Sequence, residues 1–206
     1  MDERYLTIND AETTLISSLA NELDFKYLKS QKCLKKTVKK LDFILNFYSC
    51  KWNKVGDRIE VNVGFHIYNK NYGKIPVDSV VASKMIKPKD KEWFDITTEE
   101  KLNEVFAELR KVLNVEIKSL CSMFEKNYNE AVEYLFNEKF DEFNVHLDYI
   151  ADTLGKDIIQ NKVKQISDSF SADIINQIEE YKNGARNKMW MLNRNNIKYI
   201  VDNNYI

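Results

Sequence analysis

The sequence predicts an α+β protein in which an N-terminal helix and an antiparallel sheet precede a long helical half. Apolar residues recur at helical spacing near the N-terminus, alternate with polar residues in the middle, and return to helical spacing from about residue 102 onward. The 206 residues are enough for one large domain or for a domain with a helical appendage. We therefore expect an α+β domain over residues 1–137 and a helical C-terminal region over residues 138–206, which either packs on the first as one domain or stands apart.

The first predicted helix covers residues 10–23. Either Asn9 or Asp10 is placed to cap its N-terminus. Its apolar residues share one face at a spacing of three and four, and they are Leu15, Ile16, Leu19, Ala20 and Leu23. This pattern predicts an amphipathic helix ahead of the sheet.

Strands are predicted where the period changes to two. A short alternating run over residues 33–38 is followed by a longer one over residues 41–52 and, after the turn residues 53–57, by the clearest one over residues 59–67. Two such runs around a turn with Gly and Asp predict a hairpin with one packed face and one wetter face. Residues 69–96 contain both prolines, so we expect only short strands there, at an edge of the sheet.

The helical half is predicted to begin at a capping box formed by Thr97 and Glu100, which opens one long helix to about residue 124. Asn127 and Glu130 repeat that spacing and open the next helix. Apolar stripes over residues 140–154 and 158–178 predict two more helices that end at Gly155 and Gly184. One or two final helices are expected near the C-terminus.

Five segments together resemble an uncharacterised bacterial family, a domain of unknown function with a "GF" motif, aromatic strands and a closing "T-x-E-E" helix. They are "LDFKYLKS", "FILNFYSCKWN", "IEVNVGFHIYN", "ITTEEKLNEVFAELRKVL" and "NYNEAVEYL". The resemblance covers about residues 7–137, and Asp24 stands where that family usually has Gly before Phe25. It implies an α+β domain and assigns no active residue to this chain.

The balance of charged residues limits the classes of partner that we expect. Lys and Arg (31) nearly equal Asp and Glu (32), so no net field attracts nucleic acid or a membrane. There is no secretory signal and no apolar run of membrane-spanning length, which predicts a soluble cytoplasmic protein without a membrane partner. We expect Cys33, Cys50 and Cys121 to be reduced. A Cys33–Cys50 disulfide is conceivable across neighbouring strands, but a cytosolic compartment argues against it.

No catalytic motif occurs in the sequence, so we predict that the protein is not an enzyme and holds no metal or cofactor. One alternative is an acid–base site dispersed along the chain, with His66 and Glu60 as its first candidates. His146 lies four residues after Glu142, but two ligands do not form a zinc site.

A lysine-rich run offers a candidate anion-binding site, and its members are Lys32, Lys35, Lys36, Lys39 and Lys40. It could bind nucleic acid, with nearby aromatic residues stacking on bases. The competing interpretation, which we favour, is a solvated edge strand, because lysines on edges protect sheets from aggregation.

Two groups of aromatic and cationic residues are candidates for binding a protein partner. Tyr48, Trp52, His66 and Tyr68 belong to the predicted sheet, while Arg186, Trp190 and Arg194 lie near the C-terminus, where Trp and Arg are typical of interface hot spots. We predict a non-enzymatic bacterial or phage interaction protein, of the kind that acts as an immunity or defence factor by binding another protein. A nucleic-acid-associated factor is the alternative. The C-terminal helices could also form a homodimer.

Overall fold

The chain is an α+β protein made of two compact units. The computed structural model describes residues 5–69, 80–140, 142, 144–185 and 191–206, with only the backbone described for residues 191–195. Unit 1 is Met1–Tyr128 and unit 2 is Asn129–Ile206. The predicted fold class is confirmed, while the division between units falls earlier than the expected boundary at residue 137.

Helix α1 (Ile8–Leu23) opens unit 1. Its N-cap is Thr7, whose Oγ1 accepts a hydrogen bond from the Asp10 backbone N–H at 3.1 Å, so the expected cap at Asn9 or Asp10 is wrong. The helix ends at Asp24, which adopts a left-handed conformation with φ 58°. Glycine takes this conformation at least cost, and Asp is one of the few other residues that tolerate it.

The sheet of unit 1 is antiparallel, with strand order β1–β2–β3–β4–β5 and with β6 paired to β4. Its strands, with a 3₁₀ turn (Lys29–Gln31) after the first, are β1 (Lys26–Leu28), β2 (Cys33–Val38), β3 (Leu41–Ser49), β4 (Glu60–Asn69), β5 (Val80–Ile86) and β6 (Phe94–Asp95). The predicted hairpin is confirmed, since β3 and β4 pair from Leu41 opposite Asn69 to Ser49 opposite Val61. The alternation of apolar and polar residues sets this register, because a slip of one residue would expose the buried face.

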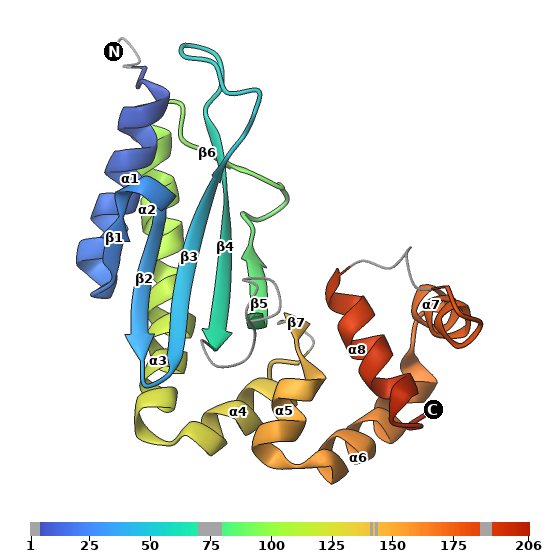
Figure 1. The fold of residues 1–206 in the computed structure, drawn as a ribbon. Coiled ribbons are helices and arrows are strands. Elements are labelled where there is room, and N and C mark those ends of the chain that lie inside the picture. The colour runs from blue at the N-terminus through green and yellow to red at the C-terminus, as the bar shows by residue number, and fades with distance from the viewer. Residues whose placement is uncertain (1–4, 70–79, 141, 143, 186–190) are drawn as a thin grey trace. The chain divides into compact units, whose positions relative to one another are not determined.

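Helices α1, α2 (Glu99–Val112) and α3 (Lys118–Lys126) cover one face of this sheet (Figure 1). The predicted long helix is interrupted by one π-helical turn, Leu113–Ile117. The capping-box prediction is wrong by one residue, because the N-cap of α2 is Thr98, whose hydroxyl accepts from the Lys101 backbone N–H. Thr97 is buried and makes other contacts.

The core of unit 1 lies between these helices and the sheet. Phe43 of β3, Phe65 of β4 and Phe124 of α3 are fully buried. The ring centroid of Phe43 lies 6.1 Å from that of Phe65 and 5.5 Å from that of Phe124. Aromatic contacts of this kind join the sheet to the helix that covers it, and they identify the odd-numbered positions of β3 as the inward ones.

Unit 2 is almost entirely helical. Its elements are α4 (Tyr128–Asn137), which begins at the unit boundary, the two-residue strand β7 (Asn144–Val145), α5 (Leu147–Leu154), α6 (Lys156–Ile166), a 3₁₀ turn (Ser167–Ser169), α7 (Ala172–Lys182) and α8 (Met191–Asp202). Gly155, with φ 102°, ends α5 as predicted.

Both long stripes predicted in unit 2 prove to be shorter helices with breaks. The stripe over residues 140–154 contains β7, so its helix begins only at Leu147. The stripe over residues 158–178 is broken before α7, because the Ser171 hydroxyl accepts from the Ile174 backbone N–H and thereby caps a new helix. After the break, Ile178 and Tyr181 of α7 are buried together with Ile197 of α8.

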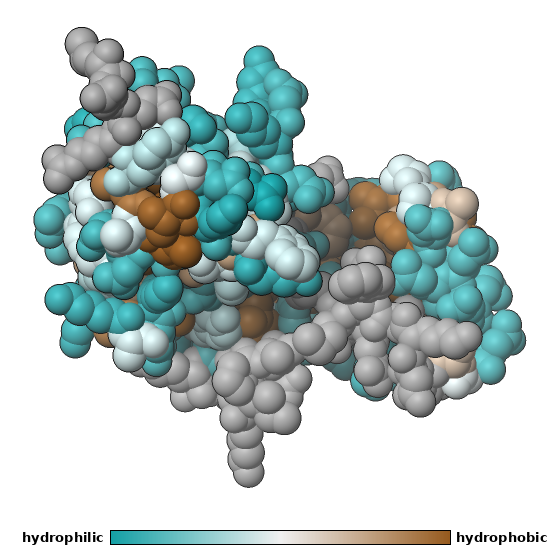
Figure 2. All heavy atoms as spheres, turned by 90° about the horizontal axis from the view of Figure 1, so that it is seen from above, coloured by the Kyte–Doolittle hydropathy of each residue, from teal (hydrophilic) through white to brown (hydrophobic). Residues whose placement is uncertain are grey.

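Hydrophilic side chains cover most of the surface seen in Figure 2, with limited apolar areas between them. The large apolar side chains most exposed among the described residues include Trp52 (67%) and Val115 (66%). None of the described helices combines the length and the apolar character that crossing a bilayer requires.

Candidate functional site

The face of the sheet opposite the helices of unit 1 carries the candidate site. Residues two apart on a strand share a face, so the even-numbered residues of β3 and β4 point away from the Phe43–Phe124 core. The pairing register sets these residues in rows, with Tyr48 opposite Asn62 and Ile44 opposite His66. We call the residues on this side the open face, and its members include Lys35, Asp42, Ile44, Tyr48, Asn62, Gly64, His66, Tyr68 and Met85.

Three residues predicted as partner contacts, Tyr48, His66 and Tyr68, come together on the open face. The Tyr48 hydroxyl lies 3.2 Å from His66 Nε2, within hydrogen-bond distance, and the His66 and Tyr68 ring centroids are 5.9 Å apart. The Tyr48 side chain remains 43% exposed, as does that of Met85 at 41%. The cluster therefore presents aromatic and thioether surface to the outside, while the Tyr48 hydroxyl and His66 Nε2 are paired with each other.

Gly64 makes this cluster possible, and the sequence patterns did not single it out. A Cβ atom at position 64 would lie 2.8 Å from His66 Nε2, 3.0 Å from Tyr48 Cε2 and 3.3 Å from Met85 Sδ. The absence of a side chain lets the Tyr48 ring lie over the β4 backbone and reach the imidazole two residues further along. A glycine in the middle of a strand marks such a close approach, which is the signal that could have found it.

Partial burial shifts the titration of every ring in the cluster toward its neutral form. Burial lowers the pKa of His66 below its usual value and raises the pKa values of Tyr48 and Tyr68. Burial likewise raises the pKa of the Cys33 thiol at the side of the cluster. At neutral pH the shifts favour the uncharged form of all four groups.

A buried charge pair lies on the same face. Asp42 is only 5% exposed, and it accepts hydrogen bonds from Lys35 Nζ at 2.8 Å and from the Thr37 hydroxyl at 2.6 Å. Since a buried carboxylate is costly without partners, these contacts explain how a charge is tolerated next to Tyr68. The pair also means that Lys35 already neutralises an acidic group of its own sheet.

Acidification is expected to destabilise unit 1 through His66. Because its pKa in the folded chain lies below the usual value, the unfolded chain binds the proton first, and stability falls as the pH drops through the usual histidine range. The slope of this loss with pH corresponds to at most one extra proton bound by the unfolded chain. The free energy of unfolding in urea is measured at pH 8 and at pH 5 for the wild type and for His66→Gln, with hydrogen exchange of the β3 and β4 amides as the probe. The decrease in this free energy from pH 8 to pH 5 should be larger in the wild type. Equal losses would contradict this assignment.

The remaining predicted partner contacts do not join the cluster. Trp52 lies beyond the end of β3 with its side chain 67% exposed, and Lys51 Nζ lies 4.9 Å from the centroid of its ring. Arg186 and Trp190 lie outside the described residues, and only the backbone of Arg194, in α8, is described. The C-terminal group therefore stays a prediction.

The predicted lysine run does not form a continuous cationic strip. Its side chains pair with acidic groups on different elements, as Lys32 Nζ lies 2.5 Å from Glu12 of α1 and Lys36 Nζ lies 3.7 Å from both Asp24 and Glu125. Lys35 pairs with Asp42 on the opposite side of β2 from Lys36. Lys39 and Lys40 lie in the turn after β2 and are exposed. Alternation along the strand places Lys35 and Lys36 on opposite faces. The ion pairs also neutralise lysine charges that would otherwise be available to bind phosphate groups of nucleic acid.

The structure does not bring together His66 and Glu60, the two residues of the dispersed acid–base alternative. Glu60 shares the face of His66 but lies six residues away on β4, a separation of about 20 Å along a strand. Its side chain pairs instead with Arg58, at 3.5 Å. Among the described residues, no group of three or more His, Cys, Asp and Glu side chains is placed to hold a metal ion. The three cysteines are free thiols.

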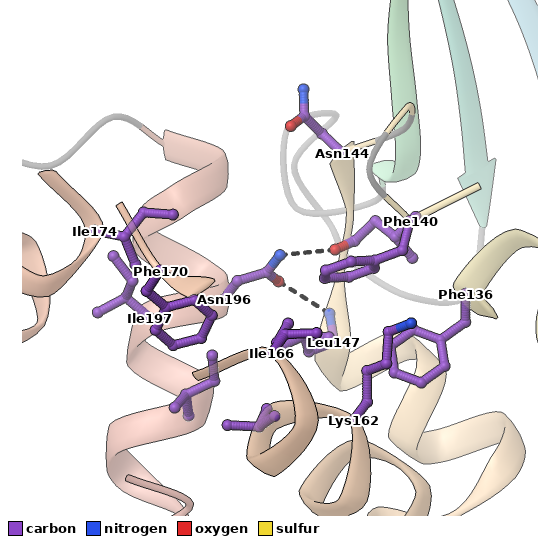
Figure 3. A pocket seen from close by; sticks show the side chains of 13 residues that line it. Phe136, Phe140, Asn144, Leu147, Lys162, Ile166, Phe170, Ile174, Asn196 and Ile197 are labelled. Carbon is purple, nitrogen blue, oxygen red and sulfur yellow. Dashed lines mark hydrogen bonds between the residues drawn. The ribbon is translucent and has the colours of Figure 1, made fainter. Parts of the chain in front are cut away.

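A second feature, in unit 2, was not anticipated from the sequence. An apolar pocket of about 170 Å³ is formed between the helices of this unit, with Lys162 and Asn196 among the residues that line it (Figure 3). Sequence reasoning assigned Phe140 and Val163 to the apolar stripes of helices. It missed the pocket because a stripe predicts which residues turn inward, and not whether they fill the space between them.

Comparison with known proteins finds no relative of this chain. No family model, no curated protein and no solved structure matches this chain. The resemblance to a bacterial family of unknown function over residues 7–137 therefore stays a prediction, and functional inference rests on the residues of the open face and the pocket.

Proposed function

We propose that this chain is a non-enzymatic interaction protein that binds another protein through the open face of unit 1. The observation that carries the proposal is the cluster of Tyr48, His66 and Tyr68, with Tyr48 and Met85 more than two-fifths exposed on a sheet face opposite the helices. Tyrosine and methionine are enriched in protein–protein interfaces, where they supply large contact areas at modest entropic cost. A bacterial or phage immunity or defence factor that blocks or recruits its partner is the class we favour.

The chemistry of the cluster supports recognition more than catalysis. His66 is kept neutral by burial, and its Nε2 is engaged with the Tyr48 hydroxyl. The nearest carboxylate on this face that the structure describes, Asp42, is already occupied by Lys35 and Thr37. A general base needs a ring nitrogen or carboxylate oxygen that is free to accept a proton from the substrate. An interface instead benefits from polar groups that are already paired before the partner binds.

Replacing Tyr48 by alanine should weaken partner binding about tenfold or more, because tyrosine is enriched among interface hot spots and this side chain is exposed on the face. Gly64→Ala should weaken it comparably without removing any group, since the new Cβ displaces His66 and Tyr48. Val115→Ala, at a residue 66% exposed in the π-helical turn on the helix side of unit 1, is the matched control and should leave binding unchanged.

Affinity capture from the source cells, followed by quantitative mass spectrometry with and without nuclease, measures these effects. A photo-crosslinking residue at position 48, and in parallel at position 115, identifies which captured protein touches the open face. The proposal requires one protein that survives nuclease, crosslinks from position 48 and is depleted in the Tyr48 and Gly64 variants. Equal crosslinking from both positions, or equal capture by all variants, would refute it.

The nucleic-acid alternative has weaker support in the geometry, because Lys32, Lys35 and Lys36 pair with acidic groups. The same capture separates the two, since recovery of RNA or DNA, or of proteins lost on nuclease treatment, would favour it. A steep fall of binding with salt would also favour it. Self-association through the C-terminal helices stays a separate prediction, for which Ile158 (37% exposed) and Ile175 (48% exposed) offer apolar surface.

A further inference from the structure

We infer that unit 2 contains a binding site for a small apolar monocarboxylate, with Lys162 as the group that recognises the carboxylate. The site is the pocket of about 170 Å³ shown in Figure 3. It lies within unit 2, and its properties do not depend on the function proposed for the open face.

The walls of the pocket are predominantly apolar and come from five helices. Phe136 of α4, Leu147 of α5, Ile166 of α6, Ile174 of α7 and Ile200 of α8 all line it. Cavities of about 150 Å³ lined by such side chains bind benzene. A volume of about 170 Å³ therefore suits a ligand body of one aromatic ring or a short alkyl chain, and it is too small for most drug-sized ligands or cofactors.

One wall of the pocket is held in place by hydrogen bonds. Asn196 of α8 donates from Nδ2 to the Val145 carbonyl oxygen at 2.8 Å and accepts at Oδ1 from the Leu147 backbone N–H at 3.0 Å. Figure 3 shows this amide reaching from α8 to the segment that carries β7 and the start of α5. Both polar atoms of the Asn196 amide are therefore engaged with backbone groups, and this wall of the pocket is formed before any ligand binds.

Of the described residues that line the pocket, Lys162 is the cationic one. Its Nζ lies 5.9 Å from the ring centroid of Phe136 and 6.0 Å from that of Phe140, whose rings meet edge to face with centroids 5.4 Å apart. Within the part of the chain that the structure describes, its ammonium forms no ion pair and has these two rings as its contacts. Lys162 therefore has the capacity to donate charge-assisted hydrogen bonds to an incoming anion.

These two properties define the ligand class. The apolar walls favour an apolar body, and the Lys162 ammonium at their side favours one negative charge on it. A phosphate dianion would need further cations or a cluster of backbone N–H groups, as in guanidinium or helix-terminus sites. A monocarboxylate with a phenyl or short alkyl body fits both the charge and the volume.

Titration of the full chain with 3-phenylpropionate and with hexanoate, followed by amide chemical shifts and calorimetry, tests the inference. The expected result is saturable binding with a Kd of about 1 mM or tighter, since small ligands gain much affinity per atom. The neutral amide of 3-phenylpropionate and the cation 3-phenylpropylamine should bind more weakly. Shifts should concentrate at the residues that line the pocket.

Two variants and one control assign the roles. Lys162→Met keeps the apolar stem and should weaken carboxylate binding about tenfold to a hundredfold while leaving the neutral amide unaffected. Ile166→Phe should fill the pocket and abolish binding of every probe, with amide spectra verifying its fold. Lys164→Met removes an exposed charge two residues along the same helix and should change nothing.

Several results would overturn the inference. They are the absence of saturable shifts with either carboxylate, equal affinity for the carboxylate and its amide, equal effects of Lys162→Met and Lys164→Met, and wild-type binding by a folded Ile166→Phe variant.

Discussion

Replacement of Phe43 by alanine is expected to lower the free energy of unfolding of unit 1 by about 3–5 kcal/mol. Phe43 is fully buried, and its ring contacts Phe65 of the neighbouring strand and Phe124 of α3. Truncation removes the apolar area that the ring buries and leaves a cavity between the sheet and the helix, which close packing prevents from collapsing fully. Urea unfolding followed by hydrogen exchange of β3 and β4 amides measures the change.

Trp52→Ala is the control for loss of a large aromatic side chain. Since the Trp52 side chain is 67% exposed, its removal should alter stability by no more than about 0.5 kcal/mol. Comparable losses for Phe43→Ala and Trp52→Ala would contradict the core position assigned to Phe43.

Thr97→Val is expected to cost about 1–3 kcal/mol, because it leaves a buried backbone donor without its acceptor. The Thr97 hydroxyl accepts from the Ile59 N–H at 2.9 Å and donates to Asp95 Oδ1, and both Thr97 and Ile59 are at most 2% exposed. These contacts tie the entrance of β4 to the segment that leads into α2. Valine has nearly the same shape as threonine and offers no acceptor.

Thr97→Ser separates the hydroxyl from the methyl group. It retains the acceptor and should lose clearly less stability than Thr97→Val in the same unfolding experiment. If serine and valine cost the same, the methyl packing of Thr97 would account for the loss and its hydrogen bonds would not.

The strands of unit 1 could be predicted because their faces have different surroundings. Phe43 and Phe65 are buried against helices while Tyr48 and His66 are not, and this difference appears in the sequence as alternation. The fold class and the β3–β4 hairpin follow from it. The open face follows as well, since the same parity that buries Phe43 places Tyr48, His66 and Tyr68 together.

Helix boundaries were predicted less well. Thr97 has a glutamate at the capping-box spacing, Glu100, whereas the residue three positions after Thr98 is Lys101, so the local sequence favours the threonine that does not cap α2. The structure assigns the cap to Thr98 because Thr97 is drawn into the core by Ile59 and Asp95. In the same way, the stripe of apolar residues continues across the break before α7, since Ile166 before the break and Ile174 after it line the same pocket.

By itself, the sequence determined the fold class, the N-terminal helix, the main hairpin and the face on which the aromatic candidates lie, because these depend on periodicity along a few neighbouring residues. Only the tertiary structure decided which side chains meet. It brought Tyr48 to His66 across Gly64, paired Lys36 with Glu125 of a distant helix, and left a pocket beside Lys162. Such contacts depend on distances between elements far apart in the chain, and no local pattern of residue types encodes those distances.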